Sequence, residues 1–287
     1  MIENMKYYLF IVLSAIGSAA IGLFTKLIGS DVPLMTLIFL RFLIATIVIS
    51  FLAPQLDKDT FKLKKTDLKD YIIIASLFVI NFSLYLPANL LAPIQNVILI
   101  NASYIFIVFI LAYFFLGEKI TKTKLFTTAL AVLGLSVINP FQAGEYFLGN
   151  MLALISGFTF AILLVKLRKA NMSHGIGDLF WFFLFATILS LPFPFIFGFG
   201  QIKSVWLLVL GLGVISTALN YFFFNLSLEK IEVEIVSLIS LIISPVSAIL
   251  LAYFFLGEAF QVRTIIGGSF LILAGIYFQL HKKKTKP

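Results

Sequence analysis

Cysteine, histidine and charge are all scarce in this chain. None of its 287 residues is cysteine, which excludes disulfides and thiolate metal sites. The two histidines, His174 and His281, both lie in polar connections, so a histidine-built metal site is not expected. Charged residues make up 12% of the chain, against about 25% in an average soluble domain. We therefore expect no metal and no cofactor, and the scarcity of charge argues against a soluble domain.

The residues that are abundant are hydrophobic. They make up 61% of the chain, with 33 Phe and a mean hydropathy of +1.09. Charges occur in clusters, separated by uncharged stretches that exceed the roughly 20 residues needed to cross a bilayer. The first residues carry a single Lys before a long apolar run and no small-residue cleavage site. This start indicates a retained first helix rather than a removed signal peptide.

The spacing of the charges predicts ten membrane-spanning helices. The uncharged stretch 71–117 is about twice as long as one helix needs, so we expect a break between Pro87 and Pro93. The stretch 179–228 is interrupted only by Lys203, where we place a second break. The predicted helices cover residues 7–28, 33–53, 71–89, 93–115, 124–141, 147–167, 178–198, 204–227, 233–256 and 261–280. The predicted fold class is an all-α integral membrane protein.

An eight-residue sequence occurs twice. Leu-Ala-Tyr-Phe-Phe-Leu-Gly-Glu at 111–118 recurs letter for letter at 251–258, a shift close to half the length of the chain. The chain therefore reads as two copies of one unit, 1–144 and 145–287, the second with a basic tail. Each copy holds five predicted spans, an odd number, so the second copy must cross the membrane in the opposite sense. Inverted repeats of this kind are an architecture of secondary transporters.

Lys and Arg in the connections indicate the orientation. If the N-terminus is cytoplasmic, 17 of the 21 Lys and Arg lie on the inner side. Only Lys26, Lys203 and Arg263 lie on the outer side, and Arg41 lies inside a span. We therefore expect a multi-pass protein of the plasma or inner membrane with both termini in the cytoplasm. The net charge of +8 then reflects topology and contact with anionic lipid rather than nucleic-acid binding.

Ten helices, an inverted duplication and Leu-Gly-Glu after the fourth and ninth helices resemble the drug/metabolite transporter superfamily, and most closely its EamA-type branch. The resemblance runs from Tyr7 to Leu280. The ninth helix, with Pro245 and the Leu-Gly-Glu that follows, fits the family pattern. The fourth helix departs from it, because Ile105 stands where the second copy has Pro245, so it lacks the residue that would kink it. The resemblance implies export or exchange of small metabolites, amino acids or drugs.

Arg41 is the charge placed deepest in a predicted span. A charge at that depth costs about 2.5–3.5 kcal/mol on insertion scales, so we expect it to face a watery cavity or a partner. One hypothesis is that its guanidinium binds a carboxylate or phosphate of the substrate. The alternative is a structural clamp on helix-end carbonyls or Asn side chains.

A polar-aromatic pair recurs in the two copies. Asn81, Tyr85 and Asn89 share one face of the third helix. Tyr221 and Asn225 occupy the positions of the second copy that correspond to Asn81 and Tyr85, so the pair recurs in swapped order. Such a pair near the midplane of two inverted helices is expected to line a central cavity from both sides. The alternative is that the Asn side chains only bridge helices, at about 0.6 kcal/mol per contact.

Two further helices complete the predicted site. Asn101 and Tyr104 share a face of the fourth helix, and Ser240 and Ser244 recur at helical spacing beside Pro245. Pro245 frees a backbone carbonyl that a substrate or water can use, although serines also suit close packing. The predicted substrate-binding residues are Arg41, Asn81, Tyr85, Asn101, Tyr104, Tyr221, Asn225, Ser240 and Ser244.

Small residues and motif acids are given structural roles. We expect Gly17 and its counterpart Gly157 at close helix contacts. Gly267 in the last helix suits the same role or a dimer contact. Glu118 and Glu258 are expected to be solvated or capping groups at helix ends, because nothing places them at bilayer depth.

These features favour a secondary transporter, not an enzyme, that moves small polar metabolites such as amino acids or drugs by alternating access. No acid lies near a predicted midplane, which favours a facilitator or exchanger over a proton-driven carrier. One alternative is a carrier of phosphorylated or nucleotide-linked metabolites, which would want more than one cavity cation. Another is a membrane-embedded lipid-precursor enzyme, which needs an acidic metal cluster or a nucleophile and base. The expected partners are a small-molecule substrate and the lipid bilayer, without nucleic acid, and the chain is expected to be a monomer or homodimer.

Overall fold

The computed structural model describes residues 2–63, 68–117, 119–138, 144–170, 172, 175–228, 230–231, 233–259 and 261–281. Every regular element in these ranges is a helix. Glu118 lies outside them. In chain order the elements are α1 (Ile2–Ile28), α2 (Leu34–Leu52), η1 (Ala53–Gln55), α3 (Leu68–Leu91), α4 (Ile94–Ala102), α5 (Tyr104–Leu116), α6 (Lys122–Ile138), α7 (Phe147–Lys169), α8 (Ile176–Ser190), α9 (Pro192–Phe197), α10 (Ile202–Gly213), the π-helix η3 (Val214–Leu219), α11 (Asn220–Leu228), α12 (Val233–Leu256) and α13 (Val262–His281).

The apolar helices match the predicted spans closely. Within the described ranges, nine helices or runs of consecutive helices are long and apolar enough to cross a membrane. α6, with 17 described residues, is shorter than these nine. Both predicted breaks are present, since α3 ends at Leu91 before Ile94 begins α4, and α9 ends at Phe197 before Ile202 begins α10. The all-α, multi-span fold class is confirmed, and the total of ten spans stays a prediction.

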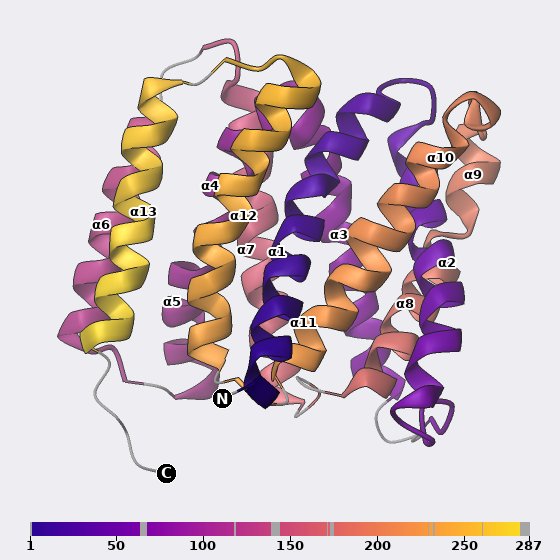
Figure 1. Ribbon diagram of the computed structural model, residues 1–287, viewed down its shortest axis with the longest axis horizontal. Helices are drawn as coiled ribbons and strands as arrows, with labels where there is room; N and C mark the ends of the chain where they lie inside the picture. Colours follow the sequence, from indigo (N-terminus) through magenta and orange to yellow (C-terminus); the bar gives the residue numbers. More distant parts are fainter. Residues whose placement is uncertain are drawn as a thin grey trace.

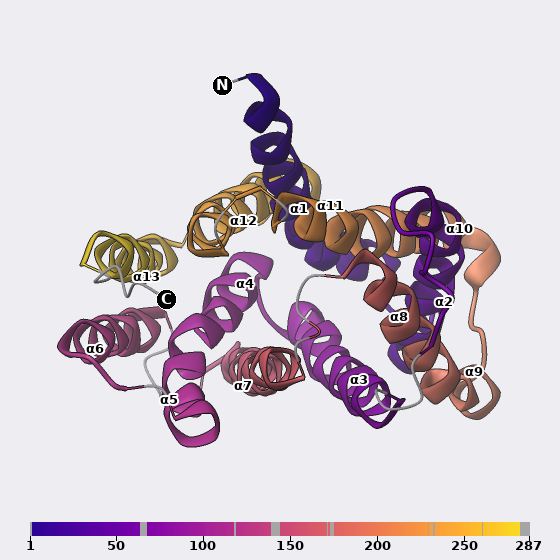
Figure 2. The same ribbon diagram turned by 90° about the horizontal axis from the view of Figure 1, so that it is seen from below.

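The fourth span is interrupted although it has no internal proline. α4 stops at Ala102 and α5 begins at Tyr104, with Ser103 between them. The Ser103 N–H bonds the Ile100 carbonyl at 3.1 Å, a three-residue spacing that tightens the turn. α5 then leaves in a different direction from α4 (Figure 2). The corresponding helix of the second copy, α12, continues unbroken through Pro245. The sequence indicated a kink in the second copy, at Pro245, but the interruption lies in the first copy, at Ser103.

The helices form two rows (Figure 2). One row holds α13, α12, α1 and the α10–α11 run, and the other holds α6, α4–α5, α7 and α3. α2 and α8 pack together at one end of the rows, and α6 packs on α13 at the other. α1 begins and α13 ends at the same end of the bundle, the lower end in Figure 1. The main apolar core takes residues from helices of both rows and from α2 and α8.

The first helix of each predicted copy packs among helices of the other copy. α1 lies against α10, α11 and α12. α7, its counterpart in the second copy, lies against α3, α4 and α5. The same set of contacts therefore occurs twice with the two halves exchanged, which is the arrangement expected of twofold-related repeats.

The repeated octapeptide ends its helix in the same way in both copies. Gly117 has a φ of +68° and Gly257 a φ of +65°, a left-handed conformation that glycine adopts without strain at helix ends. The preceding aromatic pairs, at 114–115 and 254–255, are 61–72% exposed. In a bilayer these rings face the lipid. The octapeptide therefore forms a helix end with a lipid-facing surface rather than a binding motif.

Three glycines lie at close contacts between helices. A Cβ on Gly17 would lie 2.9 Å from the Ile215 carbonyl oxygen, and one on Gly157 would lie 2.8 Å from that of Asn101. The predicted close-packing role of these two glycines is confirmed. Gly267 packs within the chain, since its Cβ would lie 2.5 Å from the Gly134 carbonyl oxygen. Its close-packing role is thereby accounted for without a second copy of the chain.

Candidate functional site

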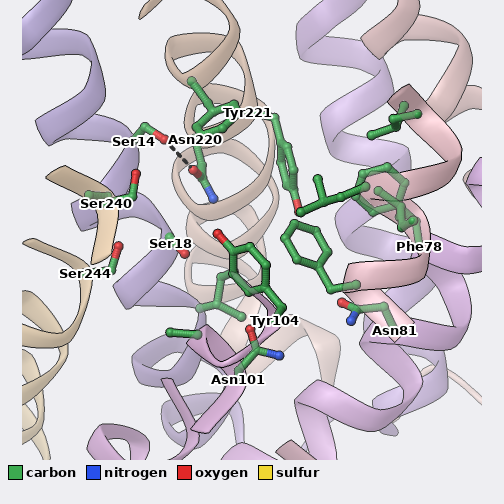
Figure 3. Close-up of a pocket in the computed structure, with 18 of the residues that line it drawn as sticks. Ser14, Ser18, Phe78, Asn81, Asn101, Tyr104, Asn220, Tyr221, Ser240 and Ser244 are labelled. Atoms are coloured by element: carbon green, nitrogen blue, oxygen red, sulfur yellow. Dashed lines mark hydrogen bonds between the residues drawn. The ribbon is translucent and has the colours of Figure 1, made fainter. Parts of the chain in front are cut away.

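A cavity of about 400 Å³ lies between the two rows of helices (Figure 3). Residues of α1, α11 and α12 line one side, and residues of α3, α4, α5, α7 and α8 line the other. Its volume falls in the range of about 300–1,000 Å³ that is usual for small-molecule sites. Both halves of the chain thus contribute to one central compartment.

The cavity wall combines rings with uncharged polar groups. Aromatic rings come from Phe78, Phe82, Tyr85, Tyr104, Phe160, Phe182, Tyr221 and Phe224, amides from Asn81, Asn101, Asn220 and Asn225, and hydroxyls from Ser14, Ser18, Ser240 and Ser244. None of the described lining residues carries a carboxylate. Such a wall offers stacking surfaces and hydrogen bonds to a ligand, with no fixed negative charge.

The cavity reaches one end of the bundle. Its lining includes Arg168 near the end of α7, Met172 and Gly175 in the connection that follows, and Leu228 at the end of α11. All of these lie at the lower end in Figure 1, where α1 begins. The cavity is therefore continuous with that end of the bundle, and Arg168 is the lining cation near its mouth.

Eight of the nine predicted residues lie around this cavity; Arg41 does not. The recurring pair lines it from both sides, with Asn81 and Tyr85 on α3 and Tyr221 and Asn225 on α11. Ser240 and Ser244 on α12 lie across the cavity from α3, and the hydroxyls of Tyr104 and Tyr221 point toward its centre (Figure 3). The structure thus brings the predicted residues together, and their contact with a substrate stays a prediction.

The amides on α3 and α4 also bridge helices. The Asn81 amide nitrogen donates to the Ser156 carbonyl at 2.7 Å, and the Asn101 amide nitrogen donates to the Ser156 hydroxyl at 3.1 Å. Both bonds tie the cavity wall to α7. Asn89, the third residue of the predicted face, donates instead to the Tyr85 carbonyl at 2.8 Å and lies outside the lining. Asn81 and Asn101 therefore do both things that were considered for the Asn side chains: they line the cavity and they bridge helices.

The opposite wall holds polar residues that the prediction missed. The Ser14 hydroxyl on α1 donates to the Asn220 amide oxygen at 2.9 Å (Figure 3). Ser18 lies one turn further along α1 and also lines the cavity. Ser14 and Ser18 recur at helical spacing within the otherwise apolar stretch 9–24, which is a signal that the sequence carried.

Arg41 lies behind the cavity wall, fully buried. Its Nε donates to the Thr217 hydroxyl at 3.1 Å, and its guanidinium carbon lies 3.6 Å from the centre of the Phe82 ring. Its two terminal nitrogens have no hydrogen-bond partner among the described residues. Of the two expected surroundings, a watery cavity or a partner, this conformation shows the partner: Arg41 is absent from the cavity lining and stacks on Phe82, whose ring belongs to that lining. Its contact with a substrate stays a prediction.

The partner of Arg41 belongs to an irregular segment. Thr217 lies in the π-helix η3, and its hydroxyl donates to the Leu212 carbonyl at 2.8 Å. Thr217 therefore accepts a hydrogen bond from α2 and returns one to the preceding turn of its own span. π-helical turns of this kind occur frequently at functional sites.

Comparison with known proteins agrees with this architecture. The model of the EamA-like transporter family matches the chain twice, over residues 5–139 and 147–280. An uncharacterised transporter of Archaeoglobus fulgidus is 28% identical over 93% of both chains, and a pseudopaline exporter of Pseudomonas aeruginosa is 23% identical over 95% of both. A solved crystal structure, 19% identical, superposes with a TM-score of 0.68 over 98% of this chain and 99% of that one. The two family matches cover nearly the whole sequence, so the chain belongs to the EamA-like transporter family.

Proposed function

We propose that this metabolite transporter is a secondary carrier that binds a small polar metabolite in the central cavity and moves it by alternating access. The observation that supports this is the cavity itself, which takes the same polar-aromatic pair from both halves and reaches one end of the bundle. Inverted repeats around a midplane site are the usual basis of alternating access. The double family match agrees with two related halves.

The lining favours a substrate that is uncharged, zwitterionic or anionic. Rings and amides supply stacking and hydrogen bonds, while the described lining holds Arg168 and no acid. Arg41 adds a positive charge behind Phe82. We propose that this charge attracts a substrate carboxylate, either through the wall or after the Phe82 ring rotates. A cationic drug would find ring faces and neutral oxygens in the described lining, but no carboxylate to pair with.

The coupling follows from the same lining. A proton-driven carrier needs a titratable group in its path, and acids are absent from the described cavity wall. We therefore propose a facilitator or exchanger that runs on the gradient of its substrate. A carrier of phosphorylated or nucleotide-linked metabolites is the second candidate, favoured only by the two arginines, one of which is screened by Phe82.

The orientation and setting complete the proposal. With both termini on the cytoplasmic face of a plasma or inner membrane, the cavity in this conformation is open to the cytoplasm. The chain then works as a monomer or homodimer.

Transport by purified protein in liposomes tests the function. The vesicles are loaded in turn with neutral amino acids, dicarboxylates, phosphate esters and cationic drugs, and exchange is measured against each external radiolabelled compound. We expect saturable exchange for members of the first two groups. Exchange confined to cationic drugs, or accumulation against a gradient when only a proton gradient is supplied, would contradict the proposal.

A further inference from the structure

The end of the bundle opposite the cavity mouth is closed by an ion pair. Lys26 near the end of α1 bonds Glu258, which follows α12. The second carboxylate oxygen of Glu258 accepts the Ile94 N–H at the start of α4, at 3.2 Å. The side chains of Lys26 and Glu258 are only 21% and 15% exposed. One carboxylate thus neutralises a lysine of α1 and caps the positive end of α4.

Further polar contacts reinforce this closure. The Gln95 amide nitrogen donates to the Ala259 carbonyl at 3.0 Å, and the Thr264 hydroxyl bonds the Asn96 amide oxygen. These bonds tie the start of α4 to the connection between α12 and α13 and to the first turn of α13. The Gln95 and Asn96 contacts therefore lie at the same end of the bundle as the Lys26–Glu258 ion pair.

Below these contacts, α1 presses against the facing row. A Cβ on Gly22 would lie 2.6 Å from the Asn89 amide oxygen and 2.8 Å from a methyl of Ile94. Only glycine leaves room for that approach. The helices that separate around the cavity therefore meet directly between it and the ion pair.

The open end uses its repeat-related lysine differently. Lys166, which holds the position of Lys26 in the second copy, bonds Asp70 at 2.5 Å and joins α7 to α3. Those two helices belong to the same row (Figure 2). The Lys26–Glu258 pair instead meets α4 across the two rows, so it lies across the path by which the cavity would open to that end.

We infer that Lys26, Glu258 and the start of α4 form the gate that closes this transporter at the end opposite the cavity mouth. The inference rests on the proposed function, since a gate is needed only if access alternates. Opening requires the carboxylate to leave both the ammonium and the helix end at once. Because those interactions are partly buried, losing one of them shifts the balance between closed and open forms strongly.

The absence of cysteine gives this gate a direct test that needs no substrate. Ser18 lines the cavity, so a Ser18→Cys variant places the only thiol of the chain there. A membrane-impermeant maleimide is applied to intact cells and, separately, to inside-out vesicles. We expect fast labelling in the vesicles and slow labelling in the cells. Adding Lys26→Gln is expected to speed labelling in the cells about tenfold, while Lys26→Arg keeps it slow.

Lys62→Gln is the matched control, because it removes an exposed ion pair with Asp59 that takes no part in the gate. It should leave labelling in the cells slow. Equal labelling rates in vesicles across all variants show that the substitutions leave access from the cavity mouth unchanged. Labelling in the cells that is fast without any gate substitution, or that Lys26→Gln leaves unchanged, overturns the gate and leaves the proposed function standing. A thiol unreactive from both faces overturns the proposed function itself.

Discussion

At the scale of single residues, Arg41 shows how a charge is kept at membrane depth without a carboxylate beside it. Its guanidinium stacks on Phe82 at 3.6 Å and donates to Thr217. A desolvated stacking contact of this kind is worth about 2 kcal/mol. The two terminal nitrogens of Arg41 have no partner among the described residues, so no described carboxylate neutralises the charge. Arg41 is therefore both a structural stack and a buried charge close behind the cavity wall.

Arg41→Gln separates these two roles. At about 10 Å a unit charge contributes roughly 1–2 kcal/mol to an anion, so we expect uptake efficiency for anionic substrates to fall about tenfold. Uptake of neutral substrates should hardly change. Arg41→Lys is the control, because it keeps the charge and loses the planar stack. Unaltered transport of every accepted substrate by the Gln variant would end the anion hypothesis.

Tyr221→Phe tests the cavity wall itself. The Tyr221 hydroxyl points toward the cavity centre, while its ring packs on Phe78 with a 5.5 Å centroid distance. Removing only the oxygen should raise the KM of a hydrogen-bonding substrate about fivefold, the loss of about 1 kcal/mol. The thermal unfolding temperature in detergent should stay the same. A lower unfolding temperature with unchanged KM would assign the hydroxyl to packing.

Much of the cavity wall could be predicted from the sequence, and the residues that were missed have physical explanations. Asn81 and Tyr221 stood out because the repeat relates their positions. Asn220 did not, because η3 adds an i+5 turn just before it and shifts the helical face that regular spacing assigns. Phe82 could not be recognised either, since whether a ring covers Arg41 depends on tertiary packing.

At the scale of elements, proline marks the break before α4 but does not interrupt the helices that contain it. α12 continues through Pro245, and α3 continues through Pro87, whereas the fourth span breaks at Ser103. Gly157 of α7 approaches the Asn101 carbonyl just before this break. The break at Ser103 therefore lies beside a close contact with α7, and the sequence of the fourth span alone cannot show that contact.

Ser103→Ala is expected to stabilise the protein. The Ser103 hydroxyl is buried and has no partner among the described residues, so its desolvation is not compensated. Replacing it with a methyl group should raise the free energy of unfolding by up to about 1 kcal/mol. Thermal unfolding in detergent measures the change. Ser136→Ala is the control, because the Ser136 hydroxyl is exposed and donates to the Val132 carbonyl. A loss of stability would indicate a partner for the hydroxyl that this conformation does not show.

Thr217→Val removes the side-chain hydrogen bond between Arg41 of α2 and η3. The variant keeps the shape of Thr217 but leaves the Arg41 Nε without its acceptor and the Leu212 carbonyl without its extra donor. A buried charged donor without a partner costs about 1–3 kcal/mol, so the unfolding temperature should drop clearly. Thr217→Ser, which restores the hydroxyl, should recover most of it. Equal stability of the Val and Ser variants would show that the bond contributes little.

At the scale of the whole molecule, the two sequence repeats are not two separate bodies. α1 packs on α11 and α12, and α7 packs on α3 and α4. The division into two copies rests on the octapeptide that occurs in both, and it stays a prediction. The exchange of first helices could not be predicted, because the pattern of each helix shows that it has a packed face but not which helix covers it.

This exchange predicts the behaviour of the separated halves. Residues 1–144 expressed alone should aggregate on detergent extraction, because the faces of α1 that bury Ser14 and Gly17 are then uncovered. Residues 145–287 should fail in the same way. Co-expression of both is expected to restore a single monodisperse peak in size-exclusion chromatography. A folded, monodisperse half on its own would contradict the exchanged packing.

The packing of α1 on α11 also means that α1 is synthesised long before the helix that it packs against. α1 is complete at Ile28, but Asn220, which pairs with Ser14, is added only when the last third of the chain is being made. At about 5–20 residues per second, the ribosome takes roughly 10–40 s to supply that partner. During that interval the polar stripe of α1 lies in the membrane without its final neighbours. The nascent chain therefore depends on insertion machinery or on its own early helices to shelter α1 until α11 arrives.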